Sequence, residues 1–306
     1  MLITRRGNDL YLVKQVDHGE VAGQLARAWG NDLFEPPAPF ESACTAAAKH
    51  DEGWRPWDDR PAFNEQESRP LHFLEISMED HIPLYHAGVE AVARMDAFAG
   101  LLVGMHWTGL YRGRWGLQSN VSDLLQADRS PVQKLQDAAV LAEESRWIPV
   151  KTGLWRGAES RAAFETRLWH DYELLQGWDL LSLFVCTAPL AAPSPASEPV
   201  LLSTTLKSLD QLPGKRLIPG VATRTGDEPV DLVLTVIEPG VVAVEPYPFS
   251  SPTAVFSVEA AIIPDRRYSS DEIAGVFRQA RTETIRCEMR PAVPAAGERR
   301  TLARPS

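Results

Sequence analysis

Histidine and aspartate side chains fall on the apolar faces of four predicted helices, where they would point into a protein core. His18, for example, recurs at helical spacing with Val21 and Leu25. A lone buried carboxylate is unfavourable by several kcal/mol unless it is paired or binds a metal. Imidazole and carboxylate together suit a divalent transition metal. The sequence therefore predicts one shared metal site, with ligands drawn from His18, His50, Asp51, His106 and Asp179.

A His–Asp dipeptide occurs twice, at His50–Asp51 and at His170–Asp171. The first is favoured as a site because the small residues of ACTAAAK would let its helix approach others closely. The break EGWRP then leaves Asp51 at a helix end, near an opening. The second, in RLWHDYELLQ, has no such setting and is predicted to lie at the surface or behind the site.

Helices that would position these residues are predicted at about 17–29, 39–52, 79–94, 97–109, 131–145 and 160–186. A loop of about twenty residues, rich in Pro, Trp and Asp, begins directly after Asp51, and long loops of this kind are often functional. Aromatic residues near the candidate ligands could line a pocket or belong to the core: Trp54, Trp57, Tyr85, Trp107 and Tyr111. Arginines in the same segments could clamp phosphate: Arg55, Arg60, Arg69, Arg112 and Arg114.

The pattern changes after the stretch TAPLAAPSPASEP (Thr187–Pro199), which is typical of a linker. Antiparallel strands are predicted at 231–237, 241–247 and 254–263, and one helix at 269–285. We therefore divide the chain into a helical metal-binding domain (1–187), a linker or loop (188–200), a β-rich portion (201–289) and a disordered tail (290–306). The expected fold is mainly α with a smaller antiparallel β-rich C-terminal portion, α+β overall.

The ordered set His18, His50–Asp51 and Asp179 resembles the HD-domain superfamily of metal-dependent phosphohydrolases. The phrases KHDEGW, LLVGMHWTGLY, LQGWDLLSLFVC and VEPYPF resemble more closely an uncharacterised bacterial family, domain of unknown function 3891. The resemblance implies an HD-like helical bundle in which His18, His50, Asp51 and Asp179 hold a first ion.

Binuclear HD proteins add two histidines from the intervening helices, with the aspartate of the dipeptide bridging both ions. His106 fits one of these roles. His81 and His86 compete for the other, since His81 stands 25 positions before His106 while His86 shares its face with apolar residues. Glu52–Gly53–Trp54 and the Trp-rich loop depart from the pattern of nucleotide-cleaving relatives, which leaves the substrate class open.

The resemblance implies a metal-dependent phosphohydrolase with one or two ions of Mn, Fe, Zn or Ni. Asp51 would orient the attacking water, and His106 would be a ligand or proton donor. One alternative is a di-iron HD-like oxygenase, and another is a non-catalytic ligand-binding or sensor module. The expected partner is a small molecule, phosphorylated under the first hypothesis, and strands of the β-rich portion could form a homodimer edge.

Composition excludes several other classes of function. The 306 residues carry a net charge of −10, which disfavours charge-driven binding to nucleic acid or to an anionic membrane. The three cysteines lie far apart, so neither a disulfide framework nor a cysteine-ligated zinc site is expected. No apolar run reaches the length of a membrane span, and a cytoplasmic protein is expected.

Overall fold

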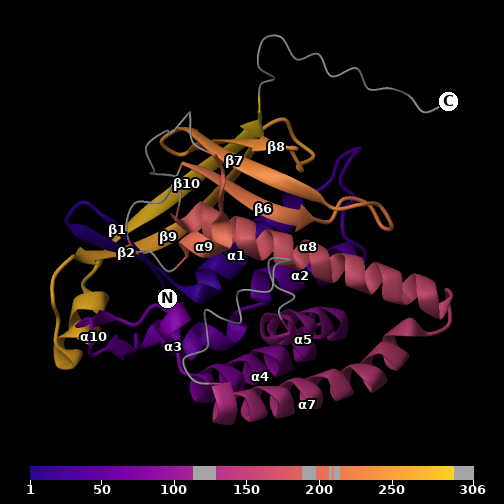
Figure 1. Cartoon of the computed structure of the whole chain (residues 1–306), viewed down its shortest axis with the longest axis horizontal. Coiled ribbons are helices and arrows are strands. Elements are labelled where there is room, and N and C mark those ends of the chain that lie inside the picture. Colours follow the sequence, from indigo (N-terminus) through magenta and orange to yellow (C-terminus); the bar gives the residue numbers. More distant parts are fainter. Residues whose placement is uncertain (113–128, 188–197, 207–208, 210–213, 293–306) are drawn as a thin grey trace.

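The computed structural model describes residues 1–112, 129–187, 198–206, 209 and 214–292. A sheet forms one side of the molecule and layers of helices cover its inner face (Figure 1). Helices α1 (Gln15–Ala28) and α8 (Arg161–Thr187) pack against the sheet. Beyond them lie α2 (Phe40–Lys49), α5 (Ala97–Tyr111), α4 (Met78–Met95) and α7 (Arg129–Trp155).

The sheet has eight strands, in the order β1-β2-β9-β10-β8-β7-β6-β5. From one edge these are Leu2–Arg6, Asp9–Val13, Ala254–Pro264, Arg281–Pro291, Val241–Glu245, Val230–Glu238, Lys215–Val221 and Val200–Leu201. Neighbouring strands are antiparallel except β10 with β8 and β5 with β6. Along β9, buried residues alternate with exposed ones, so one face of the strand meets the helices.

Short elements complete the described part of the chain. The segment after Asp51 folds into a 3-10 turn η1 (Glu52–Trp54), helix α3 (Arg55–Asp59), the small hairpin β3 (Phe63–Asn64) and β4 (Arg69–Pro70), and a second 3-10 turn η2 (Phe73–Glu75). Helix α9 (Leu202–Thr205) lies near β5 and β6, and α10 (Ser270–Arg278) precedes β10.

Helix α5 is the centre of the helical layers. It is apolar on every side, and every residue from Phe98 to Leu110 is buried, as expected for a helix surrounded by others. Asp96 ends α4 and begins α5, where its carboxylate accepts a hydrogen bond from the Ala99 amide at 2.9 Å. The buried helix brings His106 into the core, because no face of α5 is open to solvent.

Helices α1 and α2 approach each other unusually closely. A Cβ placed on Gly23 would lie 2.6 Å from the Ala48 Cβ, and one on Gly19 would lie 3.0 Å from the Ala48 carbonyl oxygen. The small residues of α2 therefore allow the approach that the sequence predicts. This contact sets His18 beside His50 at the end of α2.

The predicted mainly α, HD-like bundle is wrong, because a large sheet makes up one side of the molecule. Two strands, β1 and β2, come from the N-terminus and join β9 from far along the chain. The predicted helix at 269–285 ends at Arg278, and the rest of that segment enters β10. From Thr282 onward, exposed residues such as Thr282 and Thr284 alternate with more buried ones, which is the pattern of a strand and not of the helix that we predicted.

The sheet takes strands from both ends of the chain, so it includes residues from the predicted helical and β-rich portions alike. Most of the predicted linker and of the predicted tail lies outside the described residues, although β10 includes the tail's first two residues. Within the described residues, no helix combines the length and apolar character that crossing a membrane requires.

Candidate metal centre

Five of the predicted ligands meet at one buried point between the helices. His18 comes from α1, His50 and Asp51 from the end of α2, His106 from α5 and Asp179 from α8. All five side chains are almost completely buried. Two groups of side chains could each hold an ion, with ligand atoms within 4.8 Å of one another: His18 with His50 and Asp179, and His50 with Asp51 and His106. Because both groups contain His50, they describe overlapping parts of one centre.

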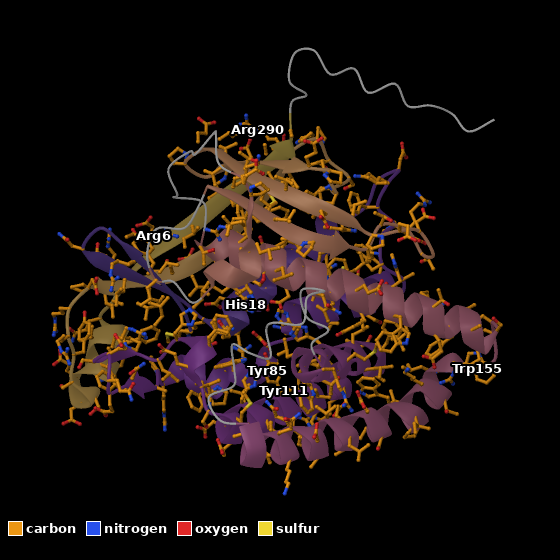
Figure 2. All side chains as sticks on the ribbon, in the orientation of Figure 1. Arg6, His18, Tyr85, Tyr111, Trp155 and Arg290 are labelled. Carbon is orange, nitrogen blue, oxygen red and sulfur yellow. The ribbon has the colours of Figure 1, made fainter. Side chains whose placement is uncertain are left out.

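The distances join the histidine Nε2 atoms to the two carboxylates. Nε2 of His18 lies 2.9 Å from the Asp51 Oδ2, and Nε2 of His50 lies 3.4 Å from the Asp179 Oδ1. Nε2 of His106 is 4.0 Å from the Asp179 Oδ2. Figure 2 places His18, Tyr85 and Tyr111 in the middle of the molecule, far from Trp155 and Arg290 at its edges.

Asp51 is held by two hydrogen bonds. The Gln15 amide donates to Oδ2 at 3.1 Å, and the Tyr85 hydroxyl donates to Oδ1 at 2.9 Å, while Nε2 of His18 lies 2.9 Å from Oδ2. Burial raises the pKa of Tyr85 well above its ordinary value, and Asp51 adds to this effect, so the phenol stays neutral and remains a donor. These contacts fix the carboxylate of Asp51 in one orientation.

Hydrogen bonds at Nδ1 prepare two rings as ligands. The Ser182 hydroxyl donates to the Asp179 carbonyl at 2.7 Å, so it accepts from Nδ1–H of His18 at 2.8 Å. Nδ1–H of His50 donates to the Ala47 carbonyl at 2.8 Å. With the Nδ1 proton committed in each ring, Nε2 is the nitrogen directed toward the centre, and it would offer its lone pair once a cation displaced any proton there, as in metal-binding histidines generally.

The residues fit a divalent transition metal. Nε2 of His50 is buried and forms no well-shaped hydrogen bond among the described residues, and the same holds for Nδ1 of His106. Such orphaned atoms are unfavourable in a core unless an ion or water engages them. Three imidazoles and two carboxylates are a donor set for Mn, Fe, Zn or Ni. The identity of the metal stays a prediction.

The charges of the site are strongly coupled. Burial alone would lower the pKa of His50, but the carboxylates of Asp51 and Asp179 outweigh it and raise the pKa to about 9. Burial alone would raise the pKa of Asp51, yet the adjacent histidines, His50 first, hold it well below its usual range. For His106, burial and the proximity of His50 lower the pKa to about 4. The site therefore stabilises ionised carboxylates in the core.

A cavity of about 40 Å³ adjoins the centre, with space for water or the reacting end of a small molecule. Polar groups line one side of it: Gln15, His18, Asp51, His81, Tyr85, His106 and Asp179. Apolar side chains form the rest: Phe73, Leu74, Leu110 and Leu183. Phe73 and Leu74 belong to η2, so the long segment after Asp51 contributes to the wall of the site.

The structure separates the two competing histidines. His81 is buried and lines the cavity, whereas His86 is 53% exposed and lies 3.4 Å from Glu90 on the surface of α4. Among the described residues, no arginine lines the cavity; three of the predicted phosphate clamps instead pair with nearby glutamates: Arg55, Arg69 and Arg112. Arg114 lies outside the described residues.

Sequence reasoning missed Gln15 as a contact of Asp51. Its position one turn before His18 on the same helix was a signal that could have identified it. Tyr85 and Tyr111 were recognised only as aromatic residues near the ligands, and the structure adds their hydroxyl groups to the site.

The second His–Asp dipeptide is buried too, which rules out the surface position, one of the two alternatives that the sequence left open. Asp171 is fully buried, and its Oδ1 accepts a hydrogen bond from the Ala38 amide at 3.1 Å. It does not belong to either metal-binding group of the described residues. Burial raises the pKa of Asp171 to about 7.

This burial predicts a pH-dependent stability. In the unfolded chain an aspartate ionises near pH 4, whereas folded Asp171 keeps its proton until about pH 7. Unfolding free energy therefore falls as the pH rises through this window and is constant above it. Asp171→Asn retains the oxygen that accepts from Ala38, so the variant should gain about 2–3 kcal/mol relative to wild type between pH 5 and pH 8. Urea unfolding at both pH values measures this, and a difference independent of pH would contradict it.

Comparison with known proteins provides a family but no described relative. Neither the curated proteins nor the solved structures give a match to this chain. Residues 1–265 match the family model described as "Protein of unknown function (DUF3891)". These residues include all five of the converging His and Asp side chains. Since the match covers most of the sequence, the chain belongs to the DUF3891 family.

Proposed function

We propose that this protein is a metal-dependent hydrolase whose centre is formed by His18, His50, Asp51, His106 and Asp179. The convergence of these five buried side chains from four helices carries the proposal. Burying the carboxylates of Asp51 and Asp179 without a cation to offset their charge would be unfavourable, because each carboxylate loses its hydration.

The chain's own residues have separable roles in this proposal. A bound divalent cation would activate water and offset negative charge on the substrate. Asp51, oriented by Gln15 and Tyr85, would accept a proton from that water or bind the cation. His18 and His50 present Nε2 to the centre because their Nδ1 atoms are committed elsewhere. The apolar wall of Leu110 and Leu183 would limit the entry of bulk water.

Phosphoester or phosphoanhydride hydrolysis is the reaction that we propose to test first. The described cavity wall includes no lysine or arginine, so charge on a phosphoryl group would have to be offset mainly by the cation. A substrate with a small reacting end suits the cavity's volume of about 40 Å³. The large apolar share of the wall also keeps the di-iron oxygenase as a second candidate, since such a wall suits an apolar substrate.

Elemental analysis of protein purified without added metal or chelator tests the proposal, followed by phosphoester and pyrophosphate assays of the loaded protein. One or two equivalents of Mn, Zn or Ni with turnover would support hydrolysis. Stoichiometric iron with oxygen-dependent turnover would favour the oxygenase instead. Protein that contains no metal and takes up none when it is added would overturn the metal-centre proposal and favour a binding module.

A further inference from the structure

His81 differs from His18 and His50 in what contacts its Nδ1 atom. That atom makes a short hydrogen bond to the Tyr111 hydroxyl, and the ring packs edge-on against Trp54 and Tyr85. Nδ1 of His18 and Nδ1 of His50 instead face oxygens that act as acceptors. Among the described residues, the partner of His81 is the only one of the three with a hydroxyl proton that is not donated to another group.

The Tyr111 contact determines which ring nitrogen carries the proton. Burial raises the pKa of Tyr111, so its phenol keeps the proton, and burial lowers the pKa of His81 to about 4, so its ring is neutral. A neutral imidazole has one unprotonated nitrogen that can accept, and the Tyr111 hydroxyl has no other acceptor for its proton among the described residues. Tyr111 therefore donates to Nδ1, and the single ring proton of His81 resides on Nε2.

A ring with its proton on Nε2 has no lone pair there for a metal. His81 is also absent from both groups whose ligand atoms lie within 4.8 Å of one another in the described chain. It nevertheless lines the same cavity as Asp51 and His106. These two features indicate that His81 donates a hydrogen bond to a molecule bound beside the metal. A neutral imidazole in that position can stabilise developing negative charge.

We propose that His81 is a neutral hydrogen-bond donor to a substrate oxygen or to an anion bound beside the metal, and that Tyr111 is the positioning residue that fixes its tautomer. The inference rests on the proposed metal centre. It assigns the site a recognition group for an oxyanion or carbonyl oxygen, and it removes His81 from the ligand set that the sequence predicts.

Azide binding to the Co²⁺-loaded protein tests this role, with visible absorbance as the readout. His81→Ala should retain full cobalt content while azide affinity falls about tenfold, the loss expected for one buried hydrogen bond. His81→Gln, whose amide reaches to a similar position, should recover part of that affinity. Tyr111→Phe should also weaken azide without loss of cobalt, and the exposed His86→Ala on the same helix should match wild type.

Nitrogen-15 NMR of histidine-labelled protein without metal provides a readout independent of the centre. We expect an unprotonated Nδ1 and a protonated Nε2 for His81, and a change in this pattern in Tyr111→Phe. Loss of cobalt in both His81 variants, a protonated Nδ1, or unchanged azide affinity in His81→Ala would overturn the proposal. If wild type shows the expected tautomer but binds no cobalt, the proposed function fails and the donor role beside a metal fails with it, while the hydrogen bond to Tyr111 stands.

Discussion

Asp51→Ala should purify with less than about a tenth of the metal bound by wild type, because its metal affinity should fall by at least about 100-fold. The substitution removes a carboxylate that belongs to the centre and that two donors hold in place: Gln15 and Tyr85. Those donors would then turn toward the remaining ligands or toward water. The helical circular dichroism signal should stay close to wild type, since Asp51 lies just beyond the end of α2. Elemental analysis by mass spectrometry measures the loss.

A control variant at another aspartate tests whether the loss of metal comes from Asp51 itself or from the loss of one negative charge anywhere in the protein. Asp59 is 62% exposed and pairs with Lys14 at 3.3 Å, outside the cavity. Asp59→Ala should therefore retain the full metal content. Asp51→Asn, which preserves shape but removes the charge, should lose most of the metal as well. Full metal content in Asp51→Ala would remove Asp51 from the centre.

Local sequence patterns were sufficient to predict that the candidate ligands lie on the buried faces of helices, because an apolar helical face can be recognised within a few turns of sequence. His18 on α1 and Asp179 on α8 illustrate this, since both lie among apolar neighbours at helical spacing. The choice between His81 and His86 could not be made in the same way. Both have apolar residues at helical spacing, and only the packing of α4 against η1 and α5 decides which one is buried.

The sheet was harder to predict because its pairing is non-local. The turn at Gly7–Asn8 between β1 and β2 is a hairpin signal, with Gly7 at φ +62°. That signal does not indicate the pairing of β2 with β9, in which Asp9 lies opposite Pro264, 255 positions further along the chain. At β10 the failure was local instead, because a capped helix at Ser269 led us to extend helical periodicity into residues that alternate as a strand.

Gly53→Ala should lower the unfolding free energy by about 3 kcal/mol and the Tm by about 5 °C. A Cβ at this position would lie 2.1 Å from the Leu84 carbonyl oxygen and 3.2 Å from the Gly88 amide nitrogen. Both contacts are with the backbone of α4, which cannot move aside as a side-chain tip can. The helix would have to separate from η1, and the contact between Asp51 and Tyr85 spans that same junction. Thermal unfolding followed by circular dichroism measures the loss, and elemental analysis should show reduced metal content as well.

Gly153→Ala is the matched control, since a Cβ there would meet no atom within 4 Å. In the exposed part of α7 the alanine should stabilise the helix by up to about 1 kcal/mol through its greater helix propensity. The two substitutions add the same methyl group, so their opposite signs would isolate the close contact between η1 and α4. If Gly53→Ala unfolded at the wild-type temperature with full metal content, this junction would not be what positions Tyr85 against Asp51. The orientation of the Asp51 carboxylate would then depend on Gln15 and His18, which both contact it from α1.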